Sequence, residues 1–151
     1  MSEVRRIGSQ LKRAYQGEAW HGPSLKELLA GVTAEQAARH PLADAHSIWE
    51  LVLHISAWES AALRRITGVY VAEPEEGAWP AVDDASETAW QNTLAHLEHK
   101  HLELRGALRR LSDEELDKPL AEGKESAYFL LHGVIQHTLY HAGQIALLKK
   151  A

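Results

Sequence analysis

Apolar residues recur at steps of three and four along most of the chain, which is the spacing of one face of an α-helix. The pattern is clearest in residues 84–111, where it is carried by Trp90, Leu94, Leu97, Leu104, Leu108 and Leu111. Similar patterns predict long helices over residues 2–16, 47–67 and 127–150. Because each long helix has an apolar face to bury, we expect an all-α four-helix bundle, formed by a single domain over residues 1–151.

Short helices are predicted between the long ones, over residues 24–31, 33–39 and 112–116. In a capping box, a serine or threonine bonds a backbone N–H three residues on, and a glutamate or glutamine there bonds back. Such boxes begin at Thr33, Ser47 and Ser112. Asp84 is interpreted as the cap that starts the third long helix.

Residues 69–83 have no helical period and contain Pro74, Gly77 and Pro80, which predicts a long loop. When extended, this segment spans up to about 50 Å, whereas a helix of about 22 residues is roughly 33 Å long. The loop can therefore return the chain to the end where the second long helix began. This permits the second and third long helices to run parallel, joined by a long crossover.

The amino-acid composition disfavours several classes of partner and of chemistry. The 151 residues are 45% hydrophobic, which is enough for one buried core. A formal charge of -5 without a dense basic run disfavours nucleic acid as a partner. The chain has no cysteine, so any thiol in its chemistry must be a cosubstrate. The N-terminal segment lacks an apolar core of signal-peptide type, and no stretch approaches membrane-span length, so we expect a cytoplasmic protein without a membrane partner.

Three histidines lie on predicted inner helix faces. His137 and His141 stand four apart in the last helix, so both leave one face about one turn apart. Such a pair alone is more often two hydrogen-bonded or partly exposed histidines than a metal site. His54, on the apolar face of the second long helix, offers a third ligand. Three histidine ligands leave positions open on a divalent ion, which is typical of a catalytic metal.

The segments SIWELVLHISAWE and HTLYHAGQIALLKK resemble the DinB/YfiT-like superfamily of four-helix-bundle proteins. In that family, a histidine in the second long helix and an H-x-x-x-H-x-G-Q element in the last helix hold a divalent metal. The positions that match this pattern are His54, His137, His141, Gly143 and Gln144. The resemblance implies a metal-binding triad of His54, His137 and His141. Members of the family include enzymes that transfer small thiols, metal-dependent hydrolases and proteins without known activity, and many form homodimers.

Three imidazoles do not select one metal, and we expect zinc or nickel, zinc first. Such an ion lowers the pKa of a water or keeps a thiol deprotonated, so both chemistries stay open. Gln144 lies on the triad's face and either bonds a ligand histidine or a water, or is a buried polar residue satisfied by backbone. His101, within the apolar seam of the third helix, is a fourth ligand, a nearby base or a hydrogen-bonded core histidine, the last being favoured.

Other residues near the triad have interpretations of their own. Trp58, one turn beyond His54, is predicted to be a core residue before a pocket wall, and Gly143 to let a facing helix approach closely. Trp79 and Trp20 are the exposed aromatic candidates for a homodimer contact.

Two functions are therefore considered. The preferred one is a metal-dependent enzyme that activates a small thiol cosubstrate or a water, acting on a small-molecule substrate. The alternative is a non-catalytic, stress-associated binding or dimeric interaction module that retains the metal site.

Overall fold

Seven helices and no β-sheet make up the computed structural model, which describes residues 1–151. The four long helices are α1 (Glu3–Gln16), α4 (Ile48–Ile66), α5 (Glu87–Leu108) and α7 (Ala127–Leu148). The short helices are α2 (Leu25–Leu29), α3 (Ala34–Ala38) and α6 (Asp113–Leu116). The predicted all-α four-helix bundle is confirmed, with element ends within three residues of those expected. No helix combines the length and the apolar character needed to cross a bilayer.

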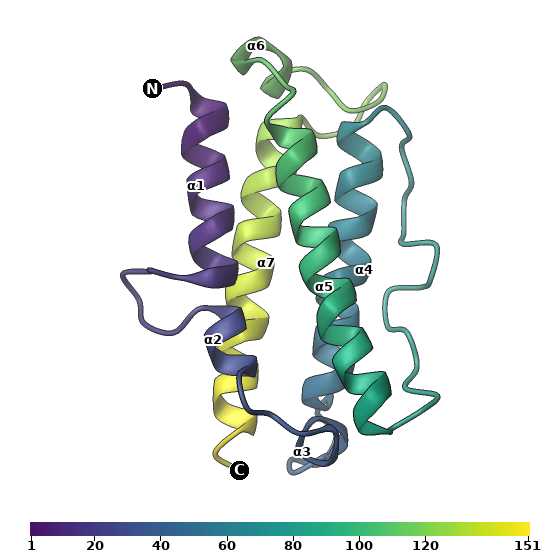
Figure 1. Cartoon of the computed structure of the whole chain (residues 1–151). Helices are drawn as coiled ribbons and strands as arrows, with labels where there is room; N and C mark the ends of the chain where they lie inside the picture. Colours follow the sequence, from purple (N-terminus) through teal and green to yellow (C-terminus); the bar gives the residue numbers. More distant parts are fainter.

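The long helices form a square in which α1 and α4 each contact both α5 and α7. The α1/α5 face therefore lies opposite the α4/α7 face. Figure 1 shows that α4 and α5 run in the same direction, and that the loop between them returns along the outside of the bundle. The predicted long crossover is confirmed.

Helix starts follow the predicted caps with one exception. The predicted capping boxes at Thr33, Ser47 and Ser112 are confirmed, and a further box that was not predicted begins α2 at Ser24. The N-cap of α5 is Ser86, whose hydroxyl accepts from the Ala89 N–H, so the assignment of the cap to Asp84 was wrong. The Asp84 carboxylate instead accepts the Ser86 N–H at 2.9 Å. Aspartate commonly forms this kind of turn, in which its side chain bonds the backbone N–H two residues further on.

Most of the core is apolar, and its two tryptophans keep their indole N–H groups bonded. Trp90 is fully buried and donates to the Val32 carbonyl at 2.7 Å, which ties α5 to the segment between α2 and α3. Trp49 donates to the Thr93 hydroxyl at 3.1 Å, which ties α4 to α5. Because a buried indole N–H without a partner is costly, these bonds help to fix how the elements pack.

One polar pair lies inside the core. His101 on α5 and Glu59 on α4 are each 1% exposed, and the imidazole Nδ1 donates to the carboxylate at 3.2 Å. The His101 ring also stacks on Tyr15 of α1, with ring centroids 4.3 Å apart. Of the three roles considered for His101, this geometry is that of a hydrogen-bonded core histidine.

Replacing His101 by leucine should lower the free energy of unfolding by about 3–5 kcal/mol, because the Glu59 carboxylate stays buried without its partner. The double variant Glu59→Met/His101→Leu should recover much of that loss, since both polar groups are then removed together. Urea unfolding followed by circular dichroism measures both values. A double variant no more stable than the single one would show that the pair is not coupled.

Candidate metal centre

The three histidines meet where α4 and α7 pack against each other. His54 leaves α4 two turns after its cap, while Leu51 and Ile55 of the same helix are buried in the core. His137 and His141 project from successive turns of α7. The Nε2 atom of His137 lies 2.9 Å from that of His54 and 3.1 Å from that of His141. The structure thus brings the three predicted residues together through their Nε2 atoms.

In two of these rings, the Nδ1 nitrogen, which faces away from the other histidines, is hydrogen-bonded to an oxygen atom. The His54 Nδ1–H donates to the Ala78 carbonyl in the crossover loop. The His141 Nδ1–H donates to Gln144 Oε1 at 2.6 Å. A neutral imidazole that donates from Nδ1 has a lone pair on Nε2. Both bonds therefore direct unprotonated Nε2 atoms to a common centre, as in metal-binding histidines whose other nitrogen is bonded to an acceptor.

The surroundings favour neutral rings. His54 and His141 are 7% and 6% exposed, and His137 is partly buried. Burial lowers the pKa of all three histidines, and the neighbouring imidazoles lower it further. For His137 the result is a pKa of about 4. Rings that resist protonation keep their lone pairs available near neutral pH, which is the state a metal ligand needs.

The crossover loop covers the site with an aromatic ring. Trp79 stacks on His54 with centroids 3.7 Å apart, and its other face stacks on His46 at 3.5 Å. From the sequence, Trp79 is predicted only as a candidate homodimer contact. The one available signal was a tryptophan next to a proline in an otherwise polar loop, and it did not indicate which helix the loop would cover.

A cavity of about 470 Å³ opens beside His54 and His137. Its wall includes Trp58, which is partly buried here and not a core residue as was favoured. Arg65 at the end of α4 is 8% exposed and donates to the Val71 and Ala72 carbonyls and to Glu125. No sequence pattern singles out Arg65 or Glu125, because their pairing joins α4 to the segment before α7.

The remaining predicted residues are placed as follows. Gln144 takes the first of its two proposed roles, because it bonds a triad histidine. His101 is not among the clustered ligand atoms, since it pairs with Glu59. Gly143 is exposed, and a side chain there would meet nothing within 4 Å, so the expected close helix approach was wrong. Trp20 is fully exposed.

The donor set fits a divalent metal ion. Ligand atoms of the three histidines lie within 4.8 Å of one another, and this group could hold an ion. For metal–nitrogen distances of about 2.0–2.1 Å, two neighbouring ligand nitrogens are about 3 Å apart, which matches the observed separations. Three neutral imidazoles suit zinc, nickel, copper or iron, and leave coordination positions for other molecules.

Comparisons with known proteins agree with this architecture. No curated protein matches the sequence. A solved structure, described as the conserved protein of locus from Enterococcus faecalis, superposes with a TM-score of 0.74. It is 16% identical in sequence, and the match covers 99% of this chain and 96% of that chain, so the likeness concerns the fold. The sequence model of the DinB superfamily matches residues 19–145, which is most of the chain and includes all three histidines, and the chain therefore belongs to the DinB superfamily.

Proposed function

We propose that this protein is a metal-dependent enzyme in which His54, His137 and His141 hold a divalent ion, zinc or nickel, that activates a small thiol or a water. The observation that carries the proposal is the convergence of three Nε2 atoms, two of them directed by bonds to Ala78 and Gln144. Membership of the DinB superfamily supports it. Because the chain supplies no cysteine, a thiol would enter as a cosubstrate, and we expect the reaction to take place in the cytoplasm.

When bound, a divalent ion with open positions favours the deprotonated form of a water or thiol beside it. The chain's own residues prepare the place where this happens. Ala78 and Gln144 orient the rings of His54 and His141, and Trp79 shields His54 from solvent. Excluding water strengthens the electrostatic interactions inside such a site.

The adjacent cavity indicates the kind of substrate. Phe129, Leu130 and Val134 contribute apolar surface beside the triad. The Arg65 guanidinium is already bonded to two carbonyl oxygens and to the Glu125 carboxylate. Its donors are therefore largely occupied and its charge is balanced by Glu125. We therefore expect a small substrate whose buried part is uncharged and largely apolar.

The outer face of α7 favours the second candidate, a non-catalytic interaction module. Phe129, Tyr140 and Leu147 are each about two-thirds exposed or more. Their spacing of eleven and seven residues aligns them along one side of the helix. In this alternative a second copy of the chain covers the stripe, as expected for a homodimer, and the histidines hold a metal without reacting.

Metal analysis is the direct test of the enzyme proposal. Untagged protein should contain about one zinc or nickel ion per chain by elemental mass spectrometry, and His54→Ala, His137→Ala and His141→Ala should each lose it with the helical circular dichroism intact. Loaded protein would then be assayed with small thiols and electrophilic acceptors. A wild-type protein that cannot be loaded with zinc, nickel, iron or manganese would favour the interaction module.

Gln144→Leu should weaken zinc binding by about 10- to 100-fold, because the His141 ring loses the acceptor that fixes its tautomer and orientation. Competition against a zinc-chelating dye measures the affinity. Gln136→Leu is the matched control, since Gln136 is exposed on the same helix. Equal affinities in the two variants would show that Gln144 does not position the ligand.

The metal-free protein should lose stability as the pH falls from about 6.5 toward 4. The pKa values of the triad are lowered in the folded state, so the unfolded chain binds more protons in this window and stability rises with pH. In excess chelator, His137→Gln should flatten the dependence of the unfolding free energy on pH relative to wild type. The same substitution at the exposed His21, which forms no ion pair, is the matched control; if both variants behave alike, the triad is not the source.

A further inference from the structure

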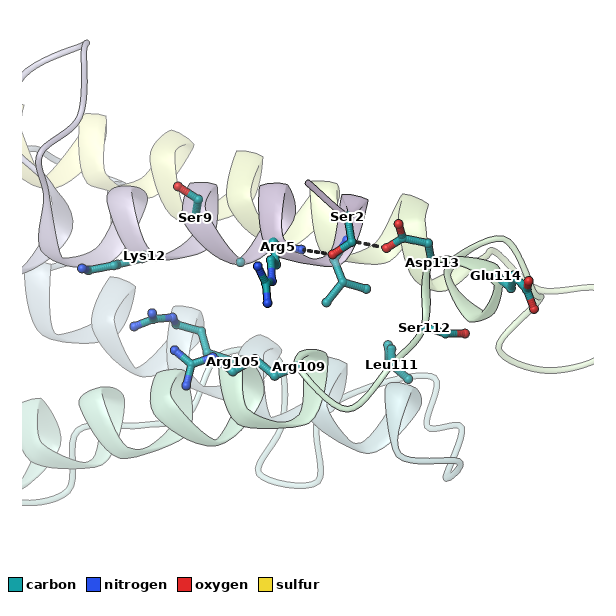
Figure 2. Close-up of a pocket in the computed structure, with 12 residues that line it drawn as sticks. Ser2, Arg5, Ser9, Lys12, Arg105, Arg109, Leu111, Ser112, Asp113 and Glu114 are labelled. Carbon is teal, nitrogen blue, oxygen red and sulfur yellow. Dashed lines mark hydrogen bonds between the residues drawn. The ribbon is translucent and has the colours of Figure 1, made fainter.

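A second cavity, of about 920 Å³, lies between α1 and α5, on the face of the bundle opposite the histidines. Four basic side chains line it: Arg5 and Lys12 from α1, and Arg105 and Arg109 from α5. Figure 2 shows Arg105 and Arg109 rising from α5 toward α1, with Arg5 reaching down toward them. In a chain with a formal charge of -5, this face gathers positive charge.

None of these four side chains forms an ion pair. The basic residues that pair with carboxylates are others: Arg6, Lys26, Arg64, Arg65 and Lys100. Two acidic residues also line the cavity: Asp113, whose carboxylate oxygens accept the N–H groups of Glu3 and Val4, and Glu114, which forms no ion pair. Four basic and two acidic side chains leave the cavity with a net positive charge.

Arg105 lacks the charged partners that a partly buried guanidinium usually has. Its Nε atom is buried without a hydrogen-bond partner, and one Nη atom donates only to the neutral Gln16 amide at 3.3 Å. Burial, with the positive charge of Arg109, lowers the pKa of Arg105. Two guanidinium groups side by side without a carboxylate repel each other, and an anion between them removes that repulsion.

Helix capping does not account for the whole cluster. Arg105 and Arg109 lie at the C-terminal end of α5, where cations interact favourably with the helix dipole. Arg5, however, lies in the first turn of α1, where the dipole disfavours positive charge. A shared ligand accounts for both positions, since α1 and α5 run in opposite directions and bring the two ends together.

We propose that this α1/α5 cavity binds a small phosphorylated anion. Arginine presents planar pairs of N–H donors that match phosphate oxygens, and several such residues suit linked phosphate groups better than a single charge. Arg5 and Lys12 are seven residues apart, so the basic surface is about 10 Å long, the size of a diphosphate group with part of its carrier. So short a surface on an acidic protein does not favour a long nucleic acid strand.

The probe is inorganic pyrophosphate, titrated by calorimetry into the full-length protein at constant ionic strength. The double variant Arg5→Gln/Arg109→Gln, in which both replaced residues are exposed, should bind at least about tenfold more weakly. Arg110→Gln is the matched control, because Arg110 is an exposed neighbour that does not line the cavity, and its affinity should stay within about twofold of wild type.

Further measurements test where pyrophosphate binds and which class of ligand the cavity prefers. His137→Ala should bind pyrophosphate as wild type does, which separates this cavity from the metal centre, and amide shifts in the NMR spectrum should cluster at Ser9 and Gly106. Absence of pyrophosphate binding, or equal losses in the Arg110 control, would overturn the proposal. So would equal binding of succinate, which would point to general anion attraction, or tighter binding of a single-stranded oligonucleotide.

Discussion

The site depends on keeping the His137 Nε2 atom about 3 Å from the Nε2 atoms of both His54 and His141, at the contact between two helices. Lone pairs at that distance repel unless a cation lies between them, and burial removes the water that would otherwise separate them. The site exists only because α4 and α7 are fixed side by side. The hydrogen bonds from Nδ1 to Ala78 and Gln144 then keep the His54 and His141 rings from rotating away. The orientation of these rings therefore depends on the two acceptors as well as on the helix contact.

The topology of the bundle explains how a loop comes to complete this site. Because α4 and α5 run parallel, the chain must travel the length of the bundle between them, along the outside. Its path carries Ala78 and Trp79 across the outer side of His54. A bundle with short antiparallel connections would have left that ring open to solvent. The long crossover therefore supplies both a hydrogen-bond acceptor and a cover.

The sequence predicted well whatever depends on local periodicity. Helical spacing located the four long helices, and capping boxes located the starts of α3, α4 and α6, because both patterns are set by residues within one turn of each other. The triad followed from spacing and resemblance, and the structure brings its members together. The contacts of Trp79, Arg65 and Glu125 were not predicted. They depend on how loops that lack a helical pattern fold against a helix. Asp84 was predicted as the cap because aspartate caps helices as readily as serine does, whereas in the structure Ser86, two residues on, takes that role.

The neutral histidine cluster and the basic cavity lie on opposite faces of the bundle, and electrostatics favours this separation. A cluster of neutral imidazoles that is to hold a cation is weakened by fixed positive charge nearby, because that charge opposes the ion. The basic residues of the cavity lie on α1 and α5, across a bundle two helices thick, roughly 20 Å away. That separation exceeds the screening length of about 10 Å at moderate salt. Near the triad, by contrast, the one buried cation, Arg65, is paired with Glu125 and bonded to backbone carbonyls. The buried cation beside the histidines is thus paired, whereas the basic residues of the cavity, which form no ion pair, lie on the far side of the bundle.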